Sequence, residues 1–378
     1  MIPELRFPEF EGDWVEKRLE KLFSEFKSGQ NITATQIKDN GKYPVYGGNG
    51  LRGYFDDFTH NGNFFLIGRQ GALCGNINRS VGKAFFSEHA IACKANDEND
   101  TEWFAQRLDY YNLNRLSESS AQPGLSVSKL LRFKLAIPTK PEQTKIANFL
   151  AIVDKRINLL QKKKAELTQY KKGVMQKLFS QEIRFEQEDD SNFPDWEEKT
   201  LGEIGEILNG LTYNPKDIND NGILVLRSSN VQNRILTFND NVFVEAQTFN
   251  PVKENDILIC VRNGSKKLIG KNAIINKENE GIAFGAFMAI YRSEYNRYLF
   301  HWFDTDEYKK EVNKNLGATI NSINGSHLRK FRIPFPSIDE QKKIANFLSS
   351  IDKAIENIAN QIEQSQKWKK GLLQRMFV

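Results

Sequence analysis

Hydrophobic residues recur with a heptad period in two stretches of the chain, one near its middle and one at its C-terminal end. Within each stretch the apolar positions advance by alternating steps of four and three residues, which is typical of a helix that buries one stripe against another helix. Each stretch predicts a helix of about 38 residues, or roughly 55–60 Å. These apolar residues are predicted to contact the other helix or a partner protein. They are Ile146, Leu150, Val153, Ile157, Leu160, Ile344, Leu348, Ile351, Ile355 and Ile358.

Neither helix can bury its stripe alone, so the pattern predicts that the two pair as an antiparallel coiled coil within the chain. Lys164 and Lys171 interrupt the first stripe, and Ser365 and Lys369 interrupt the second. We therefore expect part of the seam to face solvent or another protein. A coiled coil that only dimerises the chain is an alternative.

Before each predicted helix lies a long segment with strand-like patterning. Short runs of aromatic and β-branched residues are bounded there by Gly and Asn, as strands are. The predicted strands are 42–46, 63–67 and 83–86 in the first segment and 223–226, 256–261 and 272–275 in the second, with helical stretches near 102–114 and 295–313.

The chain is also written twice. Residues 142–150, which read EQTKIANFL, return 198 positions later as EQKKIANFL, and a Phe-Pro-Trp opening at Phe7 and Trp14 returns at Phe193 and Trp196. A period this long excludes a solenoid, whose repeats run roughly 20–50 residues. It predicts two similar halves related by an approximate two-fold.

These patterns predict an α/β (α+β) protein with two β-rich globular domains separated by a long antiparallel two-helix spacer, with pseudo-two-fold symmetry. The predicted parts are a first domain at 1–138, a first helix at 139–184, a second domain at 185–336 and a second helix at 337–378.

Composition narrows the class of protein. The 378 residues carry a formal charge of only +5, and the three cysteines are spaced unlike a disulfide framework or a zinc site. No stretch approaches the ~18 apolar residues of a membrane span, and the N-terminus has no apolar signal core. We expect a cytoplasmic protein with reduced thiols.

No catalytic or metal-binding constellation is present in the sequence. The four histidines lack ligand spacing, and there is no Walker-type lysine loop. Residues 48–53 match the dinucleotide pattern Gly-x-Gly-x-x-Gly, but the following YFDDF is unlike the helix that must present its N-terminus to a pyrophosphate. We expect no cofactor or metal in this chain and no enzyme activity of its own.

The first predicted helix is rich in lysine. One interpretation is a solvated helix face, because lysine suits exposed helix positions. The other is a helix that passes close to nucleic acid phosphates or to an acidic partner.

Two glycine-bounded loops carry side chains that can read DNA bases. Gly68-Arg69-Gln70-Gly71 follows a predicted strand, and Val261-Arg262-Asn263-Gly264 repeats the arrangement in the second segment. Arginine can bridge O6 and N7 of guanine, while glutamine or asparagine can bridge N6 and N7 of adenine. An ordinary polar hairpin is the alternative for either loop, but the presence of such a loop in both halves favours recognition.

The two divergent domains, each closed by a Glu-Gln-x-x-Ile-Ala-x-Phe-Leu-x-x-x-Asp-Lys helix, resemble the specificity subunit of type I restriction-modification enzymes. The resemblance covers essentially the whole chain. It implies a non-catalytic subunit whose variable domains are target recognition domains, each reading one half of a split sequence in double-stranded DNA. It further implies that the helices set the gap and dock two modification (methyltransferase) subunits, with restriction (motor-nuclease) subunits in the full complex.

By the same resemblance, S-adenosylmethionine, ATP and Mg²⁺ belong to the partner subunits of a DNA adenine methylation and restriction system. Loop position and chemistry then select the residues expected to contact DNA. They are Arg52, Arg69, Gln70, Asn76, Lys83, Arg227, Ser229, Asn230, Arg262, Asn263, Lys266 and Lys267.

Two other functions remain possible from the sequence. One is a coiled-coil protein-interaction scaffold without sequence-specific DNA recognition. The other, a self-sufficient methyltransferase or nuclease, is opposed by the missing cofactor and metal motifs.

Overall fold

A computed structural model describes residues 2–71, 73–117, 123–316 and 321–377 of the chain. The chain forms two compact units, one of Met1–Lys162 with Ala359–Val378 and one of Lys163–Ile358. Each unit contains part of both long helices, so the four-part division expected from the sequence remains a prediction.

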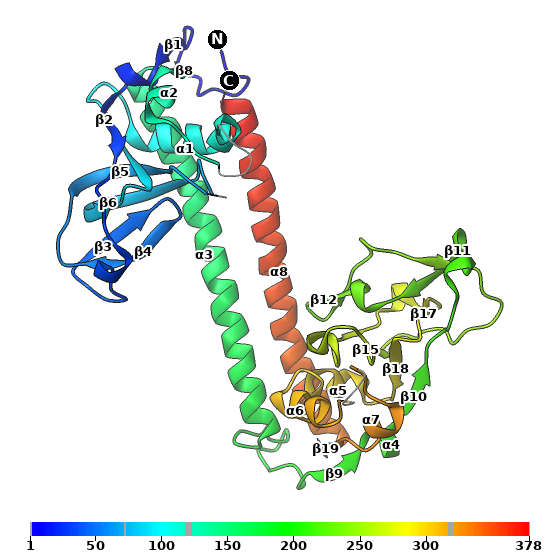
Figure 1. Cartoon of the computed structure of the whole chain (residues 1–378). Helices are drawn as coiled ribbons and strands as arrows, with labels where there is room; N and C mark the ends of the chain where they lie inside the picture. The colour runs from blue at the N-terminus through cyan, green and yellow to red at the C-terminus, as the bar shows by residue number, and fades with distance from the viewer. Residues whose placement is uncertain (1, 72, 118–122, 317–320, 378) are drawn as a thin grey trace. The chain divides into compact units, whose positions relative to one another are not determined.

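The first unit is built on a six-stranded sheet with the order β2-β7-β5-β6-β3-β4, against which helix α1 packs on β5, β6 and β7 (Figure 1). The pairs β2/β7, β5/β7, β5/β6 and β3/β4 are antiparallel, and β3/β6 is parallel. The elements are β2 Phe23–Ser28, β3 Tyr43–Gly47, β4 Gly50–Phe55, β5 His60–Gly68, β6 Ile77–Phe86, β7 Ala90–Ala95 and α1 Thr101–Tyr111, with a separate pair of β1 Val15–Arg18 and β8 Lys134–Ile137 and the short α2 Val127–Arg132. The three strands predicted in this segment are confirmed.

The second unit divides its strands between smaller sheets (Figure 1). One sheet has the order β10-β18-β15-β16 and another β14-β11-β17. Their bounds are β10 Glu206–Asn209, β18 Met288–Arg292, β15 Ile257–Cys260, β16 Asn272–Ile274, β14 Phe243–Val244, β11 Ile218–Leu226 and β17 Ala283–Phe284; the smaller pairs are β12 Val231–Gln232 with β13 Ile235–Leu236, and β9 Glu197–Thr200 with β19 Arg332–Phe335; short helices are α4 Leu201–Ile204 and α7 Gly325–Leu328.

The helical stretch predicted near 295–313 is two helices, α5 Asn296–Trp302 and α6 Asp306–Lys314. Thr305 separates them because its side chain caps α6 by accepting a hydrogen bond from the Tyr308 amide. The predicted helical stretch is therefore confirmed, but a threonine cap divides it into two helices.

The two long helices are α3 Lys140–Phe179 and α8 Ile338–Met376. In the first unit, Ile146 and Leu150 near the start of α3 share a core with Leu372 and Met376 near the end of α8. In the second unit the roles exchange, and the end of α3 shares a core with the start of α8. The pairing is thus antiparallel within each unit, as the heptad pattern predicts.

Most of the predicted seam residues are buried. Leu160 and Ile355 are partly exposed, while Ile146, Leu150, Val153, Ile157, Ile344, Leu348, Ile351 and Ile358 are buried. Because these positions recur every three or four residues, one face of each helix is removed from water.

The expectation that the lysines in the seam face solvent or another protein is wrong for Lys171. Its side chain is only 11% exposed, and its ammonium lies 2.6 Å from Asp352 and 3.6 Å from Asp304. In the first unit, Lys369 lies 2.6 Å from Asp154 in the same way. Each lysine breaks the hydrophobic stripe but pairs with an aspartate of the other long helix, because the stem of lysine can be buried while its charge is neutralised.

The repeated Glu-Gln of the two helices ties each unit to the start of its helix. Glu142 is 1% exposed, and its carboxylate accepts hydrogen bonds from the guanidinium of Arg6 at 2.8 Å and from the indole of Trp14 at 3.2 Å. The Gln143 side chain donates to the carbonyl of Pro138 at 2.9 Å. A buried carboxylate is tolerated only when it is paired and hydrogen-bonded in this way.

The second unit has the same set of bonds. Glu340 is fully buried and accepts from Arg184 at 2.8 Å and from Trp196 at 2.8 Å, and Gln341 donates to the carbonyl of Pro336 at 2.8 Å. The repeat in the sequence is therefore a repeat of one buried network.

Replacing Glu142 with Gln should destabilise the first unit by about 2 kcal/mol, because it removes the charge that neutralises Arg6. The measurement is urea unfolding followed by tryptophan fluorescence, to which Trp14 contributes. Glu16→Gln is the matched control, since Glu16 and its partner Lys134 are both more than half exposed and such surface pairs contribute little. Equal unfolding midpoints for the two variants would contradict the role of Glu142.

One buried position differs between the units. Gln106 in α1 donates to the carbonyl of Ala147 at 3.1 Å, whereas the buried His301 in α5 hydrogen-bonds through Nε2 to the hydroxyl of Ser349 at 3.1 Å. His301 is 1% exposed, and burial, followed by the positive charges of Lys171 and Arg234, lowers its pKa to about 3. This histidine is therefore neutral in the folded protein.

The second unit should lose stability as pH falls below about 6.5, since an exposed histidine of the unfolded chain then takes up a proton that His301 takes up only near pH 3. The expected loss between pH 7 and pH 5 is about 2 kcal/mol. His301→Gln, which installs the residue of the first unit, should remove that loss in unfolding measurements at the two pH values. His327→Gln, which changes an exposed histidine of the same unit, should leave it in place.

Candidate nucleic-acid interface

Three loops of the first unit meet at one edge of its sheet. The β5–β6 loop carries Arg69 and Gln70, the β3–β4 turn is formed by Gly48 and Asn49, and the β6–β7 turn carries His89. A side chain on Gly48 would lie 2.9 Å from the carbonyl of His89 and 3.5 Å from Gly68, so glycine is what allows the loops to approach.

The candidate side chains of this edge differ in exposure. Arg52 in β4, Gln70 and Asn76 are exposed, while Arg69 is partly buried. The backbone of Arg69 is used on both sides, since its amide donates to the His89 carbonyl and its carbonyl accepts from Leu125, both at 2.9 Å. The structure thus brings the loop with Arg69 and Gln70 next to the β3–β4 hairpin, whose strand β4 carries Arg52, and Asn76 lies at the far end of the β5–β6 loop.

Lys83 is not part of this group. In the β5/β6 ladder it faces Asn61, at the opposite end of the hairpin from the loop that carries Arg69. Its ammonium lies over the ring of Phe58 at 4.6 Å. A contact between Lys83 and DNA remains a prediction, but it would have to come from a different part of the domain.

In the second unit, two of the predicted loops are joined by a hydrogen bond. Asn263 donates from its side chain to the hydroxyl of Ser228 at 3.0 Å, which links the loop after β15 to the loop after β11. Arg262 is exposed, and its guanidinium lies 5.7 Å from the ring centre of Phe287. Lys266 and Lys267 are exposed on the short 3-10 helix that follows.

The residues after β11 are bound within their own loop. Asn230 is fully buried, and its side chain accepts from the Arg227 amide at 2.9 Å and donates to the carbonyl of Thr237 at 3.0 Å. Arg227 pairs with Asp240 at 3.0 Å, and the Ser229 hydroxyl is buried without a hydrogen-bond partner. In this conformation Asn230 holds the loop in shape, and Arg227 remains partly exposed. The DNA contacts predicted for Arg227, Ser229 and Asn230 remain predictions.

We call the loop of Arg69 and Gln70 and the loop of Arg262 and Asn263 the reading loops, and backbone hydrogen bonds show how they correspond. In the first unit the Arg69 amide donates to the His89 carbonyl, and the Arg69 carbonyl accepts from Leu125. In the second unit the Val261 amide donates to the Phe287 carbonyl, and the Val261 carbonyl accepts from Ile323. One residue further, Gln70 bridges to Gly124 and Arg262 bridges to Ser322. The loops therefore match with Gln70 opposite Arg262, one residue away from the alignment of Arg69 with Arg262 that the sequences suggest.

Sequence reasoning missed two residues beside these loops, His89 and Phe287. The His89 imidazole Nδ1 lies 3.2 Å from Gln70 Oε1, and Phe287 lies beneath Arg262 with 56% of its surface exposed. No spacing or motif identifies either residue, because their equivalence depends on which backbone groups pair in the folded chain.

The Gly-x-Gly-x-x-Gly motif at 48–53 is a hairpin and does not begin a helix. Its residues form the turn after β3 and most of β4, which pairs antiparallel with β3. A dinucleotide site of the expected kind needs the N-terminus of a helix at this point. The hairpin therefore does not provide the strand-to-helix turn of such a site, and the expectation that this chain binds no cofactor stays a prediction.

The thiols are not activated for chemistry. Burial raises the pKa of Cys93 well above its usual value and that of Cys260 to about 11, so both stay protonated at neutral pH. Within the described ranges no group of three His, Cys, Asp or Glu side chains could hold a metal ion.

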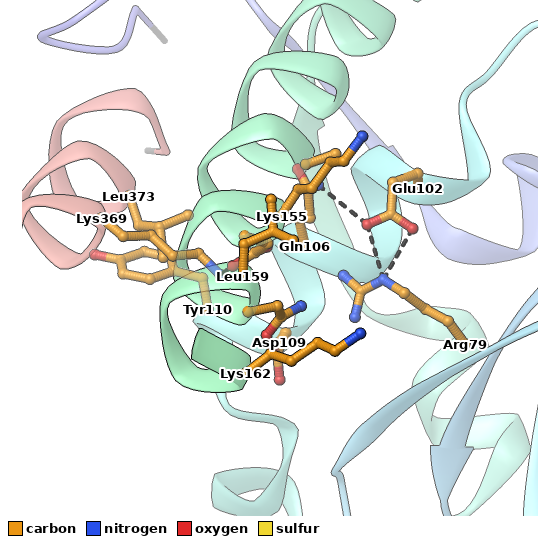
Figure 2. A pocket seen from close by; sticks show the side chains of 13 residues that line it. Arg79, Glu102, Gln106, Asp109, Tyr110, Lys155, Leu159, Lys162, Lys369 and Leu373 are labelled. Carbon is orange, nitrogen blue, oxygen red and sulfur yellow. Dashed lines mark hydrogen bonds and ion pairs between the residues drawn. The ribbon is translucent and has the colours of Figure 1, made fainter. Parts of the chain in front are cut away.

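A cleft of about 910 Å³ opens between α1, α3, α8 and β6 of the first unit (Figure 2). Its carboxylates are largely neutralised, because Arg79 pairs with Glu102 at 2.8 Å and Lys369 with Asp154 at 2.6 Å. Burial raises the pKa of Asp109 in this cleft. Lysines also line the cleft, so its lining is mixed in charge.

Two related α+β units, each presenting a polar loop where glycines let neighbouring segments approach closely, define a protein with two candidate binding surfaces of the same construction. A family model described as the type I restriction modification DNA specificity domain matches the chain twice, at residues 11–169 and 194–365. The chain belongs to this family, and the two matches make it a specificity subunit with two target recognition domains.

Individual relatives agree with the family assignment. The specificity subunit of the type I restriction enzyme EcoprrI from Escherichia coli is 40% identical over 155 residues, which are 40% of this chain and 38% of that protein. The MjaVIII specificity subunit from Methanocaldococcus jannaschii is 25% identical over 98% of this chain and 92% of its own length. The chain therefore matches about two fifths of the first relative and nearly all of the second.

A solved structure supports the fold. The crystal structure of a type I restriction-modification S subunit from M. genitalium covers 100% of this chain and 99% of its own, with 18% identity and a TM-score of 0.69. This structure confirms the mixed α+β fold, while the family model and the curated relatives confirm the resemblance inferred from the sequence and the class of a non-catalytic DNA-recognition subunit. The scaffold alternative is not favoured, because both halves match a DNA specificity domain.

None of the helices in the described parts of the chain has the length and hydrophobicity that crossing a membrane requires.

Proposed function

We propose that each unit of this specificity subunit reads one half of a bipartite, asymmetric target in double-stranded DNA. The observation that carries the proposal is the shared loop frame with different side chains. Gln70 in the first unit and Arg262 in the second have the same backbone environment, and glutamine suits adenine whereas arginine suits guanine. Because different side chains occupy the same backbone position in the two units, the two halves of the target should differ in sequence.

The remaining basic candidates suit phosphates better than bases. Lys266 and Lys267 lie next to the Arg262 loop on exposed backbone, where flexible ammonium groups can neutralise phosphates without reading sequence. Binding to DNA should then weaken with added salt, because each neutralised phosphate releases counterions.

The long helices are proposed to act as the spacer and as the dock for partner proteins. Each helix runs through both units, and at 1.5 Å per residue the 40 residues of α3 span about 60 Å. The partners proposed are two modification subunits, one for each repeat, with restriction subunits in the full complex. The S-adenosylmethionine, ATP and Mg²⁺ of the reaction are assigned to those partners, and the complex to the cytoplasm.

Arg262→Ala should relax or weaken recognition of the second half-site only, and Arg69→Ala that of the first only. The loss of discrimination should be about 1–3 kcal/mol, the range for one good bidentate contact. The measurement is genome-wide mapping of methylated adenines in a host that carries each variant with its modification partner. Arg332→Ala and Arg18→Ala are matched controls, since these arginines are exposed on β19 and β1 and lie outside the loops. Unchanged half-sites in both loop variants would refute the assignment.

Lengthening the helices should change the gap and not the half-sites. Both helices pass from one unit to the other at Lys162 and at Ile358, so one heptad inserted after each of these residues keeps the phase of the seam. The added rise of ~10 Å corresponds to about three base pairs. The same seven residues inserted after Glu188, in an exposed segment, should leave the gap unchanged. An altered half-site sequence in the helix variant would count against the spacer.

A further inference from the structure

The turn beside each reading loop is built in the same way in both units. In the first, Gln30 donates to the Phe86 carbonyl at 2.8 Å and the Ala90 amide donates to Ser87 at 2.9 Å. In the second, Leu211 donates to Phe284 at 2.7 Å and Met288 to Gly285 at 2.8 Å. These bonds make the turn at 87–90 equivalent to the turn at 285–288.

Glycines permit this construction in both places. A side chain at Gly29 would lie 2.1 Å from the Phe86 carbonyl, and one at Gly210 would lie 2.2 Å from the Gly285 carbonyl. No side chain fits at such distances, so both strands need glycine where they pass the turn. The equivalence of the two turns therefore does not depend on the surrounding sequences, which have diverged.

The third residue of the turn is His89 in one unit and Phe287 in the other. Both are well exposed, the histidine side chain at 47% and Phe287 at 56%. The carbonyls of both accept a hydrogen bond from the reading loop, His89 from Arg69 at 2.9 Å and Phe287 from Val261 at 3.0 Å. Their side chains are thus held next to the residues that follow in those loops.

Each of these side chains contacts the reader of its own unit. His89 lies with Nδ1 3.2 Å from Gln70 Oε1 and Nε2 3.0 Å from Glu88. Phe287 lies with its ring centre 5.7 Å from the Arg262 guanidinium. The pair Gln70 and His89 therefore corresponds to the pair Arg262 and Phe287, with a hydrogen bond in one unit and a cation–π contact in the other.

We infer that His89 and Phe287 are positioning residues that set base specificity, each by orienting the reader of its own half-site; the inference rests on the proposed function. His89 Nδ1 lies 3.2 Å from Gln70 Oε1, so the amide oxygen of Gln70 faces the imidazole and its amide nitrogen points away from it. An adenine-reading glutamine must present oxygen and nitrogen in a fixed order, and a fixed neighbour supplies that order.

Phe287 suits arginine for the complementary reason. An aromatic face attracts a guanidinium but accepts none of its strong hydrogen bonds, so the N–H groups of Arg262 remain available for O6 and N7 of guanine. The exposed ring can also contact a thymine methyl group. The second half-site is therefore expected to contain guanine, and the first adenine, at the position read by these pairs.

The test is methylated-adenine mapping in a host that carries the chain with its modification partner, for His89→Ala and Phe287→Ala. His89→Ala should reduce discrimination about tenfold at one position of the first half-site, and Phe287→Ala should do the same in the second. The conservative variants His89→Asn, which keeps a hydrogen-bonding side chain, and Phe287→Tyr, which keeps the aromatic face, should restore the wild-type motif. Val81→Ala and Ile218→Ala are exposed-residue controls outside these turns.

A coupled variant separates positioning from a direct contact. In a Gln70→Ala background, adding His89→Ala should change the motif no further, because the residue that His89 orients is gone. Additive effects of the two substitutions would overturn the positioning role.

The outcomes distinguish this inference from the function on which it rests. If the wild-type chain directs methylation to no bipartite motif, the proposed function fails. If the wild-type motif is bipartite and the alanine variants leave it unchanged, only the inference fails. Loss of all methylation in both the alanine and the conservative variants would assign these side chains to folding and would also overturn it.

Discussion

Each half of this protein depends on a carboxylate buried at the start of a long helix. Glu142 and Glu340 are removed from water, and each is satisfied by an arginine and a tryptophan indole that lie far away in the sequence. An unpaired buried charge would cost several kcal/mol, so the opening segment of each unit has to meet its helix at this point. The position of the opening segment relative to the long helix is then fixed, and the rest of the unit packs around these two parts.

Because this part of the backbone is the same in both units, their loop side chains can differ while the loops keep the same arrangement. The strands and glycines around the reading loops keep the same backbone bonds, whereas the side chains presented there differ. Core substitutions affect packing throughout a unit, but exposed loop residues change what is recognised at little cost in stability. The structure thus separates the parts that must stay constant from those that can vary.

Much of the architecture was predictable because it rests on local periodicity. The heptad stripes predicted α3 and α8, and short runs of aromatic and β-branched residues bounded by Gly and Asn predicted β3, β5 and β6. The candidate site was only partly accessible from sequence. Gln70 and Arg262 were among the expected residues, but their register was misaligned by one, and Lys171 was expected at a solvent-facing or partner-facing break when it is a buried ion pair.

The sequence alone determined the duplication, the two long helices and the type of chemistry in the loops, because repeats, periods and residue types are properties of the chain. Only the tertiary structure decided that Gln70 is the equivalent of Arg262, that His89 and Phe287 lie beside them, and that Lys171 pairs with Asp352. These relations arise from hydrogen bonds and ion pairs between distant segments. Such pairings are fixed when the chain packs, and no local pattern encodes them.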